Sequence, residues 1–150
     1  MSMRSAHHLI ELDTQPGFAL HDITTEVQQL VADSGIHEGI LVASSLHTTC
    51  ALTINEHESR LLDDIRLNFW RLMPPEGRYL HNDLHLRQCP ADEPRNAHAH
   101  LIAMLLGNSE TLPIHQGNLE MGRWQSLLLV ELDGPRSRQV AVQIMGTGAM

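Results

Sequence analysis

Residues 39–56 read Gly-Ile-Leu-Val-Ala-Ser-Ser-Leu-His-Thr-Thr-Cys-Ala-Leu-Thr-Ile-Asn-Glu. The apolar run over 39–45 predicts a buried strand, and residues 48–54 predict a second strand. The polar triplet His-Thr-Thr occupies 47–49, between the two apolar runs. Side chains held where one rigid element ends and another begins can be positioned without being buried in a core. The segment therefore indicates a pair of strands with a functional site beside them.

A long amphipathic helix is predicted next, over 56–73, because apolar side chains recur there at helical spacing. Asn55 is expected to cap this helix, and Glu56 to lie in its first turn, where a carboxylate is favourable. A Pro-Pro pair then ends the helix. The polar loop over 78–95 that follows has a length that is often functional in compact domains.

The remaining elements are shorter. Pro94 is expected in the first turn of a helix over about 94–106, which Gly107 ends. The other predicted elements are a strand over 6–13, a helix near 23–34 that Asp22 or Thr24 caps, and strands near 110–115, 123–132 and 138–145. Strands at both ends with helices between them predict an α+β fold. We expect a single domain over residues 1–150, with a largely antiparallel, sandwich-like sheet and two to three helices.

The composition restricts the classes of partner. The chain of 150 residues carries a formal net charge of −8, which argues against nucleic acid and anionic membranes. All 10 basic residues are arginine, so Schiff-base lysine chemistry and a P-loop lysine are excluded. Phosphate binding would fall to arginine, backbone N–H groups or a metal ion. The chain has no long apolar run, no apolar signal core and only 2 cysteines, so a cytoplasmic location is expected.

Histidine is the unusual residue type, with 11 copies in an acidic chain. His47 and Thr49 would share one face of an extended segment. A histidine at this position can bind a metal ion, act as a general base or bind an anion. A hydrogen bond to the backbone at the end of a strand is the structural alternative.

Helical geometry separates the later histidines. Asn96 and His100 are four residues apart and share one side of a helix, whereas His98 and His100 lie on different sides. His98 and His100 therefore cannot both bind one ion from a regular helix. His81, in the polar loop, is a weaker candidate ligand.

Two arginines near the end of the chain are candidates for phosphate binding. Arg136 and Arg138 would fall on one side of an extended segment and could converge on a phosphate group. A polar hairpin tip, which would place the same residues in solvent, is the structural alternative.

Several short motifs occur in a fixed order along the chain. They are His47-Thr48-Thr49, Asn55-Glu56, Tyr79-x-His81-Asn82, Asn96-x-x-x-His100-Leu101, Leu106-Gly107-x-Ser109, Pro113-Ile114, Gly117, Gly122-x-Trp124-Gln125 and Asp133-Gly134-Pro135-Arg136. In this order and spacing they resemble the YjbQ-like proteins, which are often described as secondary thiamine-phosphate synthase enzymes. The resemblance covers residues 6–146. Arg123 stands where the family usually has threonine, which bears on the choice of substrate.

The resemblance implies a compact domain that assembles as a homotrimer, and an activity that joins a pyrimidine diphosphate to a thiazole phosphate. It also implies that His47, His81 and His100 form the core of the site and hold a divalent metal ion, zinc or magnesium. On this basis His47, Glu56 and His100 are the expected catalytic residues. The expected substrate-binding residues are Thr49, Asn55, Asn96, Trp124, Gln125, Arg136 and Arg138.

Three functions stay open on the sequence alone. The first is a transferase of the thiamine-phosphate synthase type, which binds a small phosphorylated molecule and stabilises a diphosphate leaving group with arginines. The second is a hydrolase in which a three-histidine metal site activates water. The third is a non-catalytic trimeric protein that binds a small ligand or a metal ion.

Overall fold

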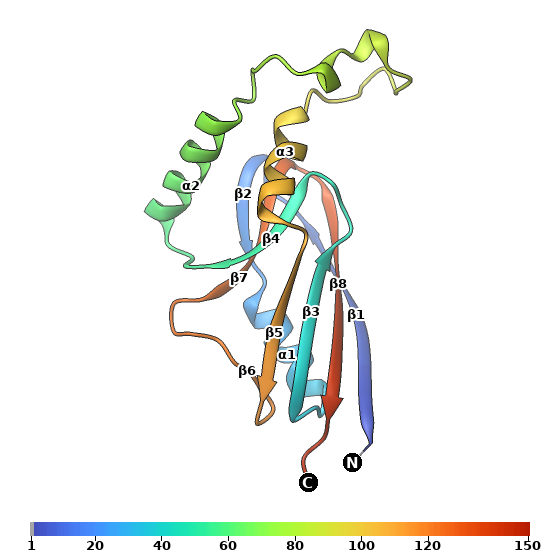
Figure 1. Ribbon diagram of the computed structural model, residues 1–150, viewed down its shortest axis with the longest axis vertical. Helices are drawn as coiled ribbons and strands as arrows, with labels where there is room; N and C mark the ends of the chain where they lie inside the picture. Colours follow the sequence, from blue (N-terminus) through green and yellow to red (C-terminus); the bar gives the residue numbers. More distant parts are fainter. Residues whose placement is uncertain (1) are drawn as a thin grey trace.

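The larger of two sheets is built from long strands along which buried and exposed side chains alternate. A computed structural model describes residues 2–150 of the chain (Figure 1). The strands of the larger sheet are β1 (Met3–Asp13), β8 (Ser137–Thr147), β3 (Glu38–Ser45), β5 (Ser109–His115) and β6 (Asn118–Leu119), paired antiparallel in that order. Every second side chain of β8 is buried, so one face of the sheet packs on a core.

The smaller sheet packs on both of its faces. It contains β2 (Gly17–Asp22), β7 (Ser126–Gly134) and β4 (Cys50–Asn55), in the order β2-β7-β4. Leu127 and Leu129 of the central strand belong to the core shared with the larger sheet, whereas Val130 and Leu132 belong to a second core on the opposite face. Burial of each such side chain is worth about 1.5–3 kcal/mol, so β7 stabilises both cores.

Two helices complete these cores. α1 (Thr24–Ser34) buries Val27 and Val31 in the core between the sheets. α3 (Ala97–Leu106) lies on the outer face of the smaller sheet, with Ala99 and Ile102 buried beneath it (Figure 1). The packing places the first turn of α3 beside the end of β7, and this junction holds the site described below.

The third helix, α2 (Ser59–Leu72), packs Phe69 and Trp70 against the second core and leaves much of its surface exposed (Figure 1). None of residues 59–72 is buried, and Leu67 and Leu72 are 52% and 64% exposed. The C-terminal end of α2 contacts β2, where the Trp70 and Phe18 rings pack edge to face with centroids 6.3 Å apart. The segment that leads on to α3 contains two short 3₁₀ helices, η1 (Leu80–Asn82) and η2 (Leu84–Leu86).

The structure confirms the α+β class and the antiparallel pairing. The predicted strands over 6–13, 39–45, 48–54, 110–115, 123–132 and 138–145 correspond to β1, β3, β4, β5, β7 and β8, with shifted ends. The predicted cap of α1 was wrong: Ile23 is the N-cap residue and no side chain caps the helix, although Asp22 accepts a hydrogen bond from the Thr24 N–H at 2.9 Å just before it. Gly35, with φ of +64°, ends that helix in the left-handed conformation that glycine adopts without steric cost.

Two predicted helix starts were wrong. α2 begins at Ser59 because the Glu58 side chain accepts the N–H groups of the first turn and replaces Asn55 as the cap. α3 begins at Ala97, whose N–H donates to the Asn82 side chain at 3.1 Å, so proline 94 precedes the helix instead of lying in its first turn.

Strand β2 was not predicted, because its six residues lie between a turn signal and a helix cap and are too few for a clear alternating pattern. No helix within residues 2–150 combines the length and apolar character needed to span a bilayer.

Candidate functional site

His47 lies in the connection between β3 and β4 and is fixed by a backbone hydrogen bond. Its Nε2 accepts from the Gln139 N–H of β8 at 2.8 Å. Burial lowers the pKa of His47, and the charge of Arg138 lowers it further against the opposing effect of Glu131. The ring is therefore neutral near pH 7. Because Nε2 accepts a hydrogen bond, we assign the ring proton to Nδ1.

Three cavities meet at His47. The polar cavity has a volume of about 650 Å³, and its walls include His47, Thr48, Asn96, His100, Arg136 and Arg138. The apolar cavity has a volume of about 450 Å³, and its walls include His47, Thr48, Cys50, His100, Ala103 and Met104. A third cavity of about 350 Å³ is lined by Glu11, Asp13, His47 and Arg138 among others. His47, Thr48 and His100 thus stand where a polar and an apolar compartment join.

His100 of α3 and Asn96, the residue before this helix, both line the polar cavity, as their four-residue spacing predicts. Burial lowers the pKa of His100, and the neighbouring His81 lowers it further, so this ring is also neutral near pH 7. His98 lines none of the three cavities at His47 and faces a separate one. The helix therefore separates the two histidines, as expected from the geometry.

His81 packs its ring edge to face against His100, with centroids 4.8 Å apart and planes at 78°. Its Nε2 is buried and has no hydrogen-bond partner among residues 2–150. Within the same residues, no group of three or more His, Cys, Asp or Glu side chains is arranged to hold a metal ion. In addition, His47 already uses Nε2 to accept the Gln139 N–H. The three predicted ligands therefore do not form a ready metal site in the chain, and metal binding stays a prediction.

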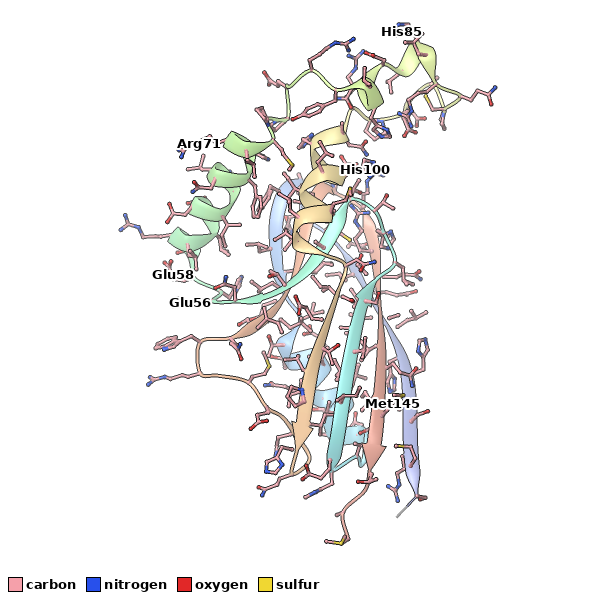
Figure 2. The ribbon with its side chains drawn as sticks, in the orientation of Figure 1. Glu56, Glu58, Arg71, His85, His100 and Met145 are labelled. Carbon is pink, nitrogen blue, oxygen red and sulfur yellow. The ribbon has the colours of Figure 1, made fainter. Side chains whose placement is uncertain are left out.

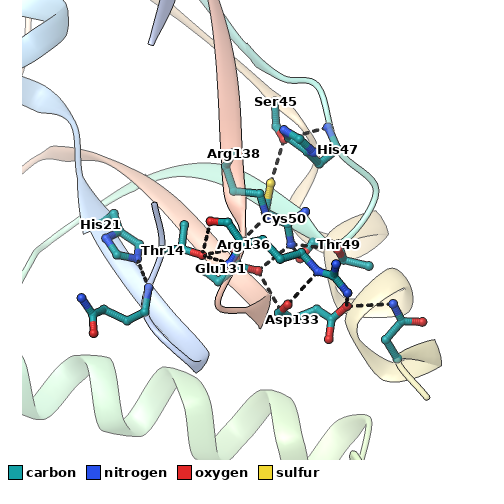
Figure 3. Close-up of polar contacts among 12 residues, drawn as sticks. Thr14, His21, Ser45, His47, Thr49, Cys50, Glu131, Asp133, Arg136 and Arg138 are labelled. Atoms are coloured by element: carbon teal, nitrogen blue, oxygen red, sulfur yellow. Dashed lines mark hydrogen bonds and ion pairs between the residues drawn. The ribbon is translucent and has the colours of Figure 1, made fainter. Parts of the chain in front are cut away.

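A buried ion pair between Glu131 and Arg138 lies beside these cavities (Figure 3). Glu131 follows the inward-facing leucines of β7, and Arg138 points inward from β8. Arg138 Nε and Nη2 donate to the two carboxylate oxygens of Glu131 at 2.7 and 2.6 Å. Thr14 Oγ1 donates to the same carboxylate at 2.6 Å, and Arg138 Nη2 also donates to Thr49 Oγ1 at 2.8 Å. The pair is rigid because both of its charges are hydrogen-bonded.

The pKa of Glu131 reflects this arrangement. Burial by itself would raise the pKa, but the hydrogen bonds from Arg138, Thr14 and the Asp133 N–H outweigh burial and hold it below its ordinary value. Glu131 is therefore a carboxylate at neutral pH.

Arg136 is held by Asp133 in a similar way. Its Nε donates to the Asp133 carbonyl at 3.0 Å and its Nη2 to Asp133 Oδ2 at 2.8 Å. Asn96 Nδ2 donates to the same carboxylate oxygen at 2.8 Å. Within residues 2–150, Nη1 of Arg136 and Nη1 of Arg138 have no hydrogen-bond partner, and both arginines line the polar cavity. Two oriented guanidinium groups thus each keep donors available.

Four of the predicted site residues lie elsewhere. Asn55 is exposed, and its side chain accepts the Glu56 N–H at 2.8 Å. Figure 2 shows Glu56 near the start of α2, away from His100 on α3. Trp124 is 65% exposed and stacks under the Arg123 guanidinium, and Gln125 accepts the N–H of glycine 122. None of these four lines a cavity at His47.

Sequence reasoning missed Glu131 and Asp133, the two carboxylates that orient the arginines. A usable signal was present, because Glu131 interrupts a run of apolar residues in a predicted strand. A carboxylate on a buried face requires a cationic partner. The alternation of β8 would then have favoured an inward-facing Arg138 as that partner.

Comparison with known proteins agrees with this fold and set of motifs. The family profile described as UPF0047 protein YjbQ-like matches residues 8–147. The chain belongs to the YjbQ-like family.

Family members from archaea and bacteria cover most of the chain. A UPF0047 protein of Methanothermobacter thermautotrophicus is 41% identical over 137 residues, which is 91% of this chain and 90% of that protein. UPF0047 protein YjbQ of Escherichia coli O157:H7 is 30% identical over 113 residues, 74% of this chain and 76% of that protein. A crystal structure from Sulfolobus solfataricus P2, described as a YbjQ-like protein of unknown function, has a TM-score of 0.88 and 39% identity, with coverage of 97% and 100%. These descriptions specify neither a reaction nor a ligand.

Proposed function

We propose that this member of the YjbQ-like family is an enzyme that acts on a small phosphorylated molecule, with its reacting centre between His47 and His100. The observation that carries the proposal is the junction of the polar cavity, about 650 Å³, with the apolar cavity, about 450 Å³, at these two residues. Such a pair of compartments suits a substrate with a charged group at one end and an apolar ring at the other.

The polar cavity would hold the phosphate group. The chain has no lysine, so arginine must supply the cationic donors. Asp133 and Glu131 hold Nε and Nη2 of Arg136 and Arg138, which orients each planar guanidinium group and leaves its Nη1 for a phosphate oxygen. Oriented donors of this kind stabilise charge that develops on a leaving group.

The two histidines would handle protons. His47 is neutral and, with Nε2 accepting the Gln139 N–H, offers a donor at Nδ1. His100 is also neutral near pH 7 and can accept a proton. General acid–base assistance from positioned side chains typically contributes about 10²–10⁴-fold in rate.

For the reaction itself, we propose a transferase of the thiamine-phosphate synthase type. A nitrogen of a thiazole phosphate would form a bond to a carbon of a pyrimidine diphosphate as the carbon–oxygen bond to the diphosphate breaks. The diphosphate would leave into the polar cavity, against Arg136 and Arg138, and His47 Nδ1–H would donate to a leaving oxygen. The support is the motif order of the family together with the polar cavity and its arginines.

The assembly that we propose is a homotrimer, and α2 supports contact between copies of the chain. Leu61, Ile65, Phe69 and Leu72 line a groove of about 350 Å³ on a helix that has no buried residue. A short helix is marginal in water without packing on one face. Sedimentation should give the mass of three 16.8 kDa chains, and a monomer would contradict the assembly.

The first test is binding of inorganic pyrophosphate to the full chain by calorimetry. Arg136→Ala should weaken binding about tenfold, because it removes a charge-assisted donor. Arg123→Ala is the matched control, since Arg123 stacks on Trp124 and lines none of the cavities at His47. Equal effects of the two variants, or no binding to the unmodified protein, would contradict a phosphate site.

Turnover is tested next, with both phosphorylated heterocycles, by mass spectrometry of the joined product. His47→Ala and His100→Ala should each reduce the rate about 100-fold. Pyrophosphate binding without any product would favour a non-catalytic binding protein. Elemental analysis of the same samples tests the metal prediction, in which the purified protein holds a divalent ion that either variant loses.

A further inference from the structure

A separate cavity lies on the other side of α3, between its first turn, the C-terminal end of α2 and the end of the smaller sheet. We call it the outer cavity; its volume is about 530 Å³. The walls of the outer cavity include Phe18, Trp70, Pro75, Glu76, His98 and Asp133. It shares only Asp133 with the network that holds Arg136, and it touches neither His47 nor His100.

The apolar walls of the outer cavity suit a flat ring. Phe18 and Trp70 meet edge to face, with ring planes at 84° and centroids 6.3 Å apart. Aromatic side chains prefer this edge-to-face arrangement or offset stacking, and the Arg66 guanidinium lies 5.4 Å from the Trp70 ring centroid, so a ligand ring would contact the remaining aromatic surface of the cavity. Pro74 and Pro75 form another wall with restricted backbone freedom. The walls are thus aromatic and stiff.

The charged groups that line the outer cavity are both acidic. Glu76 and Asp133 contribute carboxylates, and His98 is held neutral because burial lowers its pKa more than Asp133 raises it. Arg136 partly neutralises Asp133, while Glu76 is exposed and has no ion-pair partner among residues 2–150. The lining therefore favours a positive over a negative ligand.

His98 also lacks a hydrogen-bond partner at one ring nitrogen. Its Nδ1 is buried without a hydrogen-bond partner among residues 2–150. A buried polar atom without a hydrogen bond is destabilising, and a bound water or ligand is one way in which such an atom gains its partner. His98 can therefore orient a ligand that enters the cavity.

We propose that the outer cavity is a second small-molecule site, which takes a planar aromatic ring bearing a cationic amidine or amine group. The ring packs against Trp70 and Phe18. The cation lies toward Glu76 and Asp133, and His98 hydrogen-bonds the polar edge of the ligand. The site stands independently of the function proposed for the cavities at His47.

The fluorescence of Trp70 can report binding in the outer cavity. The chain has 2 tryptophans, so Trp124→Phe leaves Trp70 as the only one. In that full-length protein, benzamidine should cause a saturable change in fluorescence with a dissociation constant of about 1 mM or tighter, as expected for a small, well-seated ring. Benzoate, which has the same ring and the opposite charge, should bind at least about fivefold more weakly.

A substitution that removes one charge tests whether benzamidine binds in the outer cavity. Glu76→Gln removes one carboxylate of the outer cavity and should weaken benzamidine binding about threefold while leaving benzoate binding unchanged or stronger. Glu120→Gln makes the same chemical change at an exposed position that lines none of the cavities described, and should have no effect. The proposal is overturned by the absence of saturable binding, by equal affinity for the two probes, or by equal effects of the two variants.

Discussion

Two clusters of polar side chains lie at the same end of the sandwich and differ in how they are bonded. In the ion-pair cluster, Glu131 and Arg138 are buried and every carboxylate oxygen accepts hydrogen bonds. In the histidine cluster on and beside α3, His81 Nε2, His98 Nδ1 and Asn96 Oδ1 are buried without partners among residues 2–150. In the first cluster the chain itself completes the hydrogen bonds of the Glu131 carboxylate, whereas the second cluster leaves buried acceptors and ring nitrogens without partners.

The difference follows from the elements that carry each cluster. The ion pair joins two central strands whose positions are set by antiparallel ladders on both sides. The histidines lie on one helix and on the irregular segment before it, where the backbone is not constrained by a sheet. We infer that the ion pair stabilises the fold and that the histidine cluster serves binding, and four experiments test this division.

The largest effect is expected for Glu131→Gln. The substitution leaves the Arg138 charge buried without a carboxylate, which typically costs about 3–5 kcal/mol of unfolding free energy. Denaturant titration measures the loss, with Glu120→Gln as an exposed control. A loss below about 1 kcal/mol would show that the ion pair is not a structural element.

Acid should weaken the same cluster. Because the folded-state pKa of Glu131 is depressed, its stabilisation is present above the pKa of the unfolded chain and is lost as the pH falls through the folded-state pKa. The melting temperature of the unmodified protein should therefore fall at acidic pH. Glu131→Gln should show a smaller fall over the same range, and parallel curves for the two proteins would contradict this origin of the acid sensitivity.

The third substitution, at His81, is not expected to lower the stability of the fold. His81→Phe replaces a buried nitrogen that has no partner with an apolar ring of similar shape, which is nearly neutral or stabilising. The melting temperature should stay the same or rise by a few degrees, while turnover with the phosphorylated substrates falls because the ring that packs against His100 is replaced. A loss of more than about 2 kcal/mol would place His81 with the structural cluster instead.

The smallest effect on stability is expected for Arg136→Ala. Arg136 is exposed, and its ion pair with Asp133 is worth little to the fold, so the unfolding free energy should change by no more than about 0.5 kcal/mol. Pyrophosphate binding should weaken in the same protein. A large shift in melting temperature would make this arginine structural.

Much of the architecture could be predicted from local patterns. The apolar runs of β3 and β7, the placement of Asn96 and His100 on one side of the polar cavity, and the glycine that ends α1 each follow from neighbouring residues. β2 could not be found this way, because it is a short strand held by pairing with β7, far along the sequence. The cap at Glu58 was missed because glutamate is an uncommon residue at that position.

The site was harder to predict than the fold. Local spacing correctly placed Asn96 near His100. It could not show which of the residues close to His47 in the sequence are also close to it in the folded chain. Glu56 follows His47 closely in the chain, yet β4 carries it away from His100 (Figure 2). Arg138, far along the chain, is brought to Thr49 because β8 of the larger sheet faces the smaller sheet, whose strand β4 begins after Thr49.

The position of Asp133 has a consequence for how ligands would influence one another. Its carboxylate holds Asn96 and Arg136 of the polar cavity and also lines the outer cavity. A cation in the outer cavity would compete with Arg136 for this one negative charge and so change both the net charge and the orientation that the guanidinium group offers to an anion. By thermodynamic linkage the influence is reciprocal, so each ligand would change the affinity of the other by the same factor. A single shared carboxylate would couple the two cavities without any movement of the sheets.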